Sequence, residues 1–326
     1  MDLSKPQKTI LVTGGAGFIG SHLCDKLLEL GAKVICFDNL FTGKEENIAH
    51  NKTNSLFVFL KGDVNKYDEL EKIFVDYKID YVFHFAAVIG VKRVEENPLL
   101  VISDITGIEN ILKLSKKHNV KKVIFASSSE AYGDTSEMPL SEDTNREIKN
   151  NQNHQLHLYA LVKLMGERMM KIYTDSHGLP TCSLRFFNVF GPRQESSAYG
   201  FVIGVFIKQI INNEPPTIFG EGYQTRDFIY VEDVARLSIK ALLVAETNGE
   251  VVNIGIGRQT TILDLAERLI RISSKDLKPK FLPPRKYEIR YRSPDVTKMH
   301  KLLGTIEDRL DENLALTYKW YNDRRK

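Results

Sequence analysis

Two side chains that could move a proton stand one helical turn apart in the sequence, Tyr159 and Lys163. Residues four apart lie on the same face of a helix, so the phenol and the ammonium would be neighbours. A nearby cation favours the phenolate and lowers the pKa of a tyrosine from about 10 towards neutrality. Such a tyrosine could accept the proton of a substrate hydroxyl while hydride leaves the same carbon. The pair also occurs on ordinary helix surfaces, so it needs further partners to indicate a site.

Two further polar residues, Ser128 and Glu130, follow an apolar run at residues 123–126 that predicts a strand. Ligands of open α/β sheets bind at the carboxyl ends of the strands, where both side chains would stand. Ser128 could hydrogen-bond the hydroxyl from which the tyrosine takes its proton. By its position alone, Glu130 could be an ordinary helix-start or loop carboxylate that faces water. The residues themselves therefore single out Tyr159, Lys163 and Ser128 as candidate catalytic residues.

A glycine-rich turn at residues 13–22 could hold the hydride acceptor. It joins an apolar run typical of a buried parallel strand to a helix with leucines on one face. A dinucleotide pyrophosphate can rest there on free backbone N–H groups at the helix N-terminus. Gly14 permits the tight turn, Gly17 lets the backbone approach the phosphate, and Gly20 lets the helix pack on the strand. The glycine spacing alone also fits an ordinary turn between strand and helix.

The identity of the dinucleotide is predicted from Asp38, which ends the next apolar run eighteen residues after Gly20. A carboxylate at that strand tip accepts hydrogen bonds from the adenosine ribose and repels a 2′-phosphate, which favours NAD over NADP. The alternative is a carboxylate that only caps a turn. Asp63, after the third strand, could meet the adenine. Ala86 and Ala87, after the fourth, are small enough to let the nicotinamide ribose pass near the sheet.

Strand-like and helix-like stretches alternate along the chain, which predicts an α/β fold with a doubly wound parallel sheet. The expected strands are residues 10–12, 34–37, 57–60, 81–85, 123–126, 181–186 and 251–254. From about Asn188 glycine, proline and aromatic residues become more frequent. We predict a Rossmann-type NAD-binding domain over residues 1–187, to which residues 230–256 return. Residues 188–229 and 257–326 are expected to form a smaller C-terminal substrate domain.

The composition argues against several classes of partner. The 326 residues include 42% hydrophobic and 27% charged side chains, with a formal net charge of +3. This small charge gives no reason to expect nucleic acid or membrane as a partner, and no apolar run reaches the length of a membrane span. Cys24, Cys36 and Cys182 are expected to be buried free thiols in a reducing cytoplasm. His84 lies between aromatic residues and is expected in the core, and we expect no metal site.

Together these motifs resemble the extended short-chain dehydrogenase/reductases, and among them the NAD-dependent nucleotide-sugar epimerase/dehydratase family. The motifs occur in the family's order over nearly the whole chain: TGGAGFIG, Asp38, Gly62-Asp63-Val64, His84-Phe85-Ala86-Ala87, Ser127-Ser128 before Tyr132-Gly133, and Tyr159-x-x-x-Lys163. The resemblance implies a seven-stranded Rossmann-type sheet and a C-terminal domain that binds a nucleotide sugar. It also implies homodimers through the helices near residues 98–118 and 158–177, and a tightly held NAD that is reduced and reoxidised within one turnover.

The resemblance also assigns roles to single residues. Ser128 matches the family's Ser or Thr, Tyr159 its base and Lys163 the partner of that base. The NAD contacts that it implies are Gly14, Gly17, Phe18, Ile19, Gly20, Asp38, Asn39, Asp63, Val64, Phe85, Ala86, Ala87, Tyr159 and Lys163. Residues near the nucleotide diphosphate are matched by Asn188, Arg226 and Arg292. Arginine forks suit phosphate oxygens, and UDP is the favoured nucleotide.

The expected reaction is 4-epimerisation of a UDP-hexose or of its N-acetylhexosamine or hexuronic acid relative. In this family C4 is oxidised transiently to a 4-keto sugar, and hydride returns to the other face. Family dehydratases and decarboxylases use a glutamate at the position of Glu130. The resemblance thus adds Glu130 to the candidate catalytic residues, and 4,6-dehydration and UDP-glucuronate decarboxylation are alternatives. A non-catalytic NAD-sensing protein fits less well, because the Ser, Tyr and Lys set is intact. Two residues depart from the family pattern, Leu158 in place of Pro and Asp104 in place of Asn.

Overall fold

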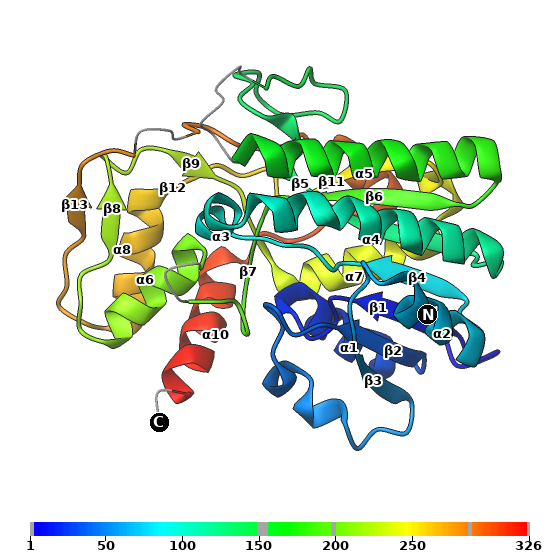
Figure 1. The fold of residues 1–326 in the computed structure, drawn as a ribbon. Coiled ribbons are helices and arrows are strands. Elements are labelled where there is room, and N and C mark those ends of the chain that lie inside the picture. Colours follow the sequence, from blue (N-terminus) through cyan, green and yellow to red (C-terminus); the bar gives the residue numbers. More distant parts are fainter. Residues whose placement is uncertain (1–2, 149–155, 197–199, 286–288, 325–326) are drawn as a thin grey trace.

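The central element is a parallel sheet of seven strands in the order β11-β6-β5-β4-β1-β2-β3. The computed structural model describes residues 3–148, 156–196, 200–285 and 289–324 (Figure 1). The strands are β1 (Thr9–Thr13), β2 (Lys33–Asp38), β3 (Phe57–Lys61), β4 (Tyr81–His84), β5 (Lys122–Ser128), β6 (Thr181–Phe186) and β11 (Glu250–Ile254). The order reverses between β1 and β4, which is where such sheets bind ligands. The predicted α/β fold with a doubly wound parallel sheet is confirmed.

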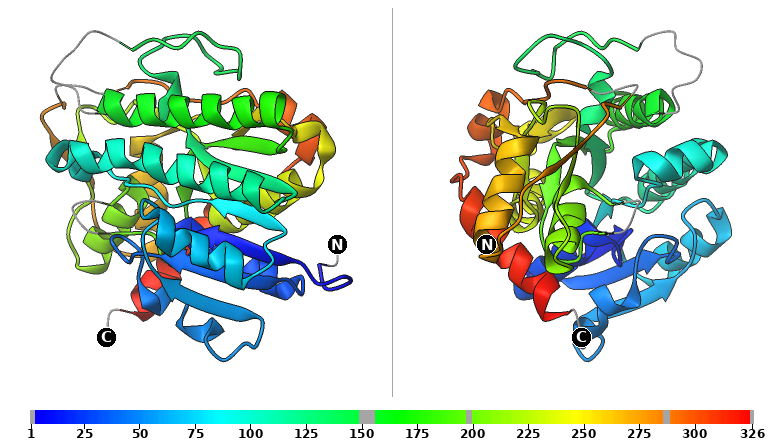
Figure 2. Two further views of the ribbon diagram at one scale, coloured as in Figure 1. Left: turned by 45° about the vertical axis from the view of Figure 1, so that its right-hand side comes forward. Right: turned by 90° about the vertical axis from the view of Figure 1, so that its left-hand side faces the viewer.

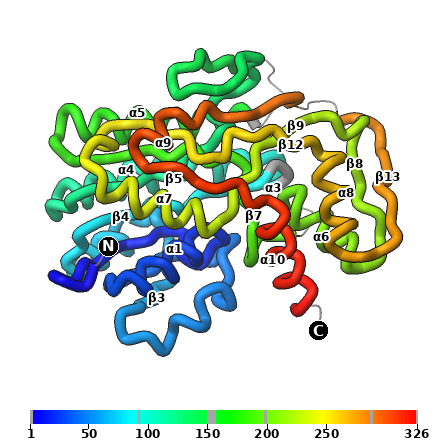
Figure 3. The backbone as a smooth tube through the Cα atoms, turned by 180° about the vertical axis from the view of Figure 1, so that it is seen from behind, coloured from blue at the N-terminus to red at the C-terminus, as the bar shows by residue number. Residues whose placement is uncertain are grey.

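Helices cover both faces of this sheet (Figures 2 and 3). One face carries α1 (Phe18–Glu29), α7 (Val231–Leu243) and α9 (Thr297–Leu303). The other carries α2 (Tyr67–Asp76), α4 (Pro98–Lys117) and α5 (Leu156–His177). Apolar side chains recur every three or four residues and reach the sheet, as Leu23 and Leu27 do in α1. Full burial of each such side chain contributes about 1.5–3 kcal/mol, which fixes the helices on the strands.

A smaller lobe stands beside the carboxyl ends of the strands, on the left of Figure 1. It is built from α6 (Val202–Ile211), α8 (Ile262–Ser273), α10 (Leu310–Asp323), β8 (Thr217–Phe219), β13 (Lys280–Leu282), β9 (Thr225–Arg226) and β12 (Thr260–Thr261). The strands β8 and β13 are parallel, and β9 and β12 are antiparallel. The lobe has its own apolar core, to which β7 (Asn188–Phe190) and β10 (Phe228–Tyr230) contribute.

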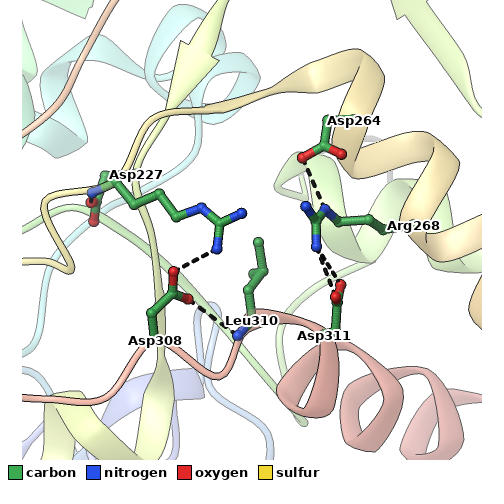
Figure 4. Close-up of polar contacts among 7 residues, drawn as sticks. Asp227, Asp264, Arg268, Asp308, Leu310 and Asp311 are labelled. Atoms are coloured by element: carbon green, nitrogen blue, oxygen red, sulfur yellow. Dashed lines mark hydrogen bonds and ion pairs between the residues drawn. The ribbon is translucent and has the colours of Figure 1, made fainter.

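Ionic contacts hold α10 and the residues just before it against the rest of the lobe (Figure 4). The Arg268 guanidinium donates to both carboxylate oxygens of Asp311, at 2.7 and 2.8 Å. The Arg258 side chain donates to Asp308 at 2.6 Å, and its backbone N–H donates to Asp227 at 2.8 Å. Asp227 is fully buried and also accepts the N–H of Ile256, so this carboxylate organises the loop after β11. The aspartate in the motif Thr225-Arg226-Asp227-Phe228 is therefore structural.

Short elements complete the fold. They are α3 (Val91–Glu96) and the 3-10 turns η1 (Glu45–Asn47), η2 (Ala49–Asn51), η3 (Ser129–Tyr132) and η4 (Ala245–Thr247). The sequence did not predict the two- and three-residue strands, because they are too short for a periodic pattern. The three cysteines are free and buried, as expected. Among the described helices, none combines the length and the hydropathy that a membrane span requires.

Candidate active site

A cavity of about 1530 Å³ runs along the carboxyl ends of the strands and reaches into the smaller lobe. Residues that follow β1, β2, β3, β4 and β5 border it from the sheet, and residues of β8, β9 and α6 border it from the lobe. All fourteen predicted NAD contacts border this cavity. The structure therefore brings the glycine turn, the acidic strand tips and the Ser, Tyr and Lys set to one space.

The glycine turn between β1 and α1 is built for close backbone approach. Gly14 has a left-handed φ of +71°, and a Cβ there would lie 2.7 Å from the backbone nitrogen of Ala86. A Cβ on Gly20 would collide with the carbonyl of Gly14. Gly17 precedes α1, whose first turn carries neither a side-chain cap nor an acidic residue. The first N–H groups of α1 are thus available to an anion.

Asp38 ends β2 and borders the cavity. Its Oδ2 accepts the N–H of Ala16 at 3.0 Å, and its Oδ1 accepts the N–H of Leu40 at 2.8 Å. Burial raises the pKa of this carboxyl, and these hydrogen bonds oppose the rise. Asp38 can therefore cap the turn and also be available to a ribose, because one carboxylate can hold the loop and still face the cavity.

The proposed proton-transfer pair lies on α5 at the wall of the cavity. The Lys163 ammonium donates to the carbonyl of Ala126 at 2.8 Å and lies 5.5 Å from the centre of the Tyr159 ring. It also lies 4.9 Å from the centre of the Phe125 ring. Ser128 borders the same cavity, and its hydroxyl lowers the pKa of Tyr159, so the two hydroxyl groups are neighbours. The structure thus joins the three residues that the sequence singled out.

The expected pKa of the tyrosine needs correction. Burial raises the pKa of Tyr159 above its ordinary value, and the nearby Ser128 side chain only partly opposes this rise. The nearby carboxylates of Asp104 and Glu130 raise it further. Burial also lowers the pKa of Lys163 to about 8. The spacing correctly predicts that the two groups are neighbours, but desolvation outweighs the pairing that the spacing implies.

Glu130 belongs to η3 and borders the cavity. Its backbone N–H donates to the Ser128 hydroxyl at 3.2 Å, which places it directly beside the reaction site. Its carboxylate lies 3.5 Å from the guanidinium of Arg292, and its side chain is 36% exposed. The structure therefore places Glu130 in the cavity wall with a cationic partner.

Arg292 is not among the described residues that border the cavity. Its side chain is 3% exposed and donates to the carbonyls of Ser129 and Gly133, the latter at 2.7 Å. The contact between Arg292 and a diphosphate stays a prediction, and in this structure the guanidinium holds the turn after β5. The cavity is bordered instead by Arg285 and Arg290.

The other two predicted diphosphate residues do border the cavity. Arg226 is on β9, and its guanidinium donates to the carbonyl of Thr225 at 2.8 Å. Asn188 begins β7 and donates to the carbonyl of Asp227 at 3.0 Å. Arg285 lies over the Phe219 ring, 4.4 Å from its centre. Arg285 and Arg290 were not predicted as site residues. The only sequence feature that points to them is the basic stretch after the proline pair 283–284.

Histidines near the site have structural partners. His84 is buried, and its ring shares a hydrogen bond of 2.8 Å with the Thr13 hydroxyl, as expected for a core histidine. His157 borders the cavity and pairs with Asp134 at 2.8 Å. His154 lies outside the described residues. Within the part of the chain that the structure describes, no group of three or more His, Cys, Asp or Glu side chains could hold a metal ion.

The family model of the NAD dependent epimerase/dehydratase family matches residues 10–255. The chain belongs to this family. The match spans all seven strands of the central sheet except the first residue of β1, together with the Ser, Tyr and Lys set. The matched range therefore contains the glycine turn, Asp38 and the Ser, Tyr and Lys set.

Individual members of this family resemble the chain over almost its full length. A putative UDP-glucose 4-epimerase of Methanocaldococcus jannaschii is 36% identical over 97% of this chain and 99% of its own. The structure of a UDP-N-acetylglucosamine 4-epimerase from Methanobrevibacter ruminantium, with UDP-N-acetylmuramic acid, superposes with a TM-score of 0.90. It is 37% identical over 99% of this chain and 100% of that one. A UDP-glucuronic acid 4-epimerase from Bacillus cereus, with UDP-glucuronic acid and NAD, has a TM-score of 0.86 and 34% identity over 97% and 99% of the two chains.

Proposed function

We propose that the protein is an NAD-dependent UDP-sugar 4-epimerase. The observation that carries the proposal is the meeting of Ser128, Tyr159 and Lys163 in a cavity that also contains the glycine turn and Asp38. The names of the three relatives support a UDP-sugar and reaction at C4. The glycine cradle and the uncapped start of α1 fit the pyrophosphate of NAD. When bound, NAD supplies a hydride acceptor that also returns the hydride.

Each residue of the set has a distinct task. Ser128 holds the C4 hydroxyl and aligns it with the Tyr159 oxygen. Tyr159 accepts the hydroxyl proton and later gives it back, so the protein ends the cycle in the state in which it began. The Lys163 ammonium favours the phenolate that forms, because an opposite charge in a buried site stabilises it. Epimerisation further requires the 4-keto sugar to turn within the site, for which a large cavity is suited.

The nucleotide end of the substrate would lie in the smaller lobe. Arg226, Arg285 and Arg290 border the cavity there, and arginines bind diphosphate oxygens through paired N–H groups. Asn188, at the start of β7, borders the same cavity, where its side chain could contact the diphosphate. UDP is the nucleotide in the names of all three relatives.

We further propose a homodimer that forms through α4 and α5. These two helices pack side by side and leave large apolar side chains exposed: Leu99, Leu100 and Ile102 on α4, and Leu161, Met165 and Ile172 on α5. Exposed apolar groups of this size on adjacent helices are typical of a contact surface.

The buried free thiols fit the reducing interior of a cell, and we expect the enzyme to be cytoplasmic.

A lyase reaction is the second candidate, and Glu130 favours it. This carboxylate borders the cavity beside Ser128, where it could take the proton next to a C4 ketone. A 4,6-dehydratase would lose water, and a decarboxylase acting on a uronic acid would lose carbon dioxide. The Glu130 carboxylate lies 3.5 Å from the Arg292 guanidinium, and this contact directs it towards the turn after β5, which favours the epimerase.

Product analysis separates these reactions. Purified protein is incubated with UDP-glucose, UDP-N-acetylglucosamine and UDP-glucuronic acid, and products are analysed by mass spectrometry and NMR. An unchanged mass with inverted stereochemistry at C4 supports the epimerase, and loss of water or carbon dioxide contradicts it. Tyr159→Phe should lower turnover by about 100-fold or more. Tyr173→Phe is a matched control on the same helix and should keep wild-type turnover.

A further inference from the structure

The segment 191–196, which we call the strap, follows β7 and contacts helices on both faces of the central sheet. Its backbone turns at Arg193, which has a φ of +67°. A residue other than glycine keeps such a left-handed φ where surrounding contacts hold it. Contacts of this kind exist on either side of Arg193, so the strap has a defined path over the molecule.

The first anchor of the strap lies on α1. The Arg193 guanidinium pairs with the Asp25 carboxylate at 2.8 Å, and both side chains are largely buried. One turn earlier on α1, the ring of His22 donates from Nε2 to the carbonyl of Pro192 at 3.0 Å. These contacts hold the first half of the strap against the face of the sheet that α1 covers.

The second anchor lies on α3. Arg93 donates from Nη2 to both carboxylate oxygens of Glu195, at 3.2 and 3.4 Å. The same guanidinium donates from Nη1 to the carbonyl of Ile89 at 2.8 Å, which fixes it on the loop after β4. The second half of the strap is therefore attached to the residues that follow β4.

The two anchors lie on opposite faces of the sheet. The helix α1 covers one face, and α3 packs against α4 and α5, which cover the other (Figure 1). A segment that contacts both α1 and α3 must cross the carboxyl ends of the strands. It crosses where the strand order reverses, because α1 follows β1 and α3 follows β4. This is the crevice in which sheets of this kind bind a dinucleotide.

Between the two anchors, Gln194 faces the cavity. It is 4% exposed and borders the cavity that the glycine turn also borders. Its Nε2 donates to the carbonyl of Val189 at 2.7 Å, while its Oε1 has no hydrogen-bond partner among the described residues. A buried acceptor without a donor costs free energy until a ligand or a water molecule supplies one. The middle of the strap is thus directed at whatever fills the cavity.

We propose that the strap closes over bound NAD and that its two ion pairs govern how fast NAD enters and leaves. A dinucleotide that reaches from the glycine turn after β1 to Ala86 and Ala87 after β4 spans the same crevice as the strap. The strap then crosses the cofactor and blocks its exit while both anchors hold. The inference rests on the proposed function only in taking NAD as the dinucleotide.

The anchors join one part of the protein to another, and neither of them requires NAD in order to form. Loss of an anchor therefore raises the fraction of molecules with an open strap by the same factor with and without NAD. The rate constants of association and release should rise together, and the Kd should stay within about twofold of its wild-type value. Loss of an ordinary ligand contact acts differently, because it raises mainly the release rate.

The test uses Glu195→Gln and Arg193→Gln, which remove one anchor each. Glu71→Gln is the matched control, because Glu71 also pairs across two helices, with Lys117 at 2.6 Å, and its side chain is 30% exposed against 35% for Glu195. NADH is the probe, since its fluorescence changes on binding. Association is followed by stopped-flow with nucleotide-free protein, and release by displacement of bound NADH with excess NAD. We expect both rates to rise about fivefold in each strap variant and to stay at wild-type values in the control.

An unchanged association rate in the strap variants would overturn the proposal even if release became faster, because that result describes the loss of an ordinary contact. Equal acceleration in Glu71→Gln would overturn it as well. Misfolding cannot imitate the expected result, since damaged protein would bind NADH more slowly. The measurement contains no UDP-sugar. If the rates change as expected but no UDP-sugar is converted, the strap stands and the proposed reaction fails.

Discussion

Gly14→Ala probes the turn that holds the dinucleotide. Gly14 has a φ of +71°, and an L side chain in that left-handed region costs about 1–2 kcal/mol. The new methyl carbon would also lie 2.7 Å from the nitrogen of Ala86 and 2.8 Å from the carbonyl carbon of Phe85. Backbone atoms cannot turn aside as a side chain does, and such overpacking costs about 1–3 kcal/mol more. We expect Gly14→Ala to lower the free energy of unfolding by about 2–5 kcal/mol.

Gly178→Ala separates the two contributions. Gly178 has a φ of +64°, close to that of Gly14, but none of the described atoms outside its own neighbours lies within 4 Å of a Cβ there. Gly178→Ala should therefore lower the free energy of unfolding by only about 1–2 kcal/mol, the cost of an L residue in the left-handed region.

The assay has two readouts. Thermal melting with and without added NAD reports stability, with a shift of about 2–4 °C for each kcal/mol. Chromatography of the denatured protein reports NAD that was retained through purification. Gly178→Ala should retain NAD. Gly14→Ala should lose most of it, because the new methyl group pushes the backbone at Ala86 away and this narrows the cavity. Equal melting and equal NAD content in the two variants would refute the reasoning.

Further substitutions test the remaining assignments. Because burial lowers the pKa of Lys163 to about 8, kcat should fall as the pH rises through that value, which a pH profile between 6 and 10 checks. Arg290→Gln should raise KM for the UDP-sugar about tenfold without changing the melting temperature, since one charge-assisted hydrogen bond is worth about 1.5–3 kcal/mol. Arg292→Gln should affect stability and not KM. It should lower the free energy of unfolding by about 2–4 kcal/mol, because it leaves buried carbonyls without a donor. Arg185→Met leaves the Glu167 carboxylate buried without its partner at 2.7 Å and should cost about 3–5 kcal/mol in urea unfolding, part of which Glu167→Gln restores.

The residues that were predicted from the sequence share a property. Gly14 directly follows a strand, and Asp38 and Ser128 each end one. The apolar runs of these strands are easy to recognise, and a parallel sheet brings all such strand ends to one edge. Tyr159 and Lys163 are four apart on one helix, so their contact is local. These residues could be placed because their geometry depends on regular elements.

The missed features depend on long-range packing. Arg285 and Arg290 lie in an irregular stretch without periodicity, and only the folded lobe turns them towards the cavity. Arg292 stands at the spacing of the family motif, but the carbonyls of the turn after β5 bind its guanidinium. The raised pKa of Tyr159 is a consequence of burial, which spacing along a helix cannot reveal.

The position of β11 has a consequence for synthesis of the chain. Residues 187–249 separate the end of β6 from the start of β11. A ribosome that adds about 5–20 residues per second needs roughly 3–13 s for this stretch. Throughout that interval the nascent sheet ends at β6, whose unpaired N–H and C=O groups are open to pairing with another chain. The helix α6 and the strands β8 and β9 are made in the same interval, so the sheet is completed after these cavity-lining elements but before Arg285 and Arg290 are made.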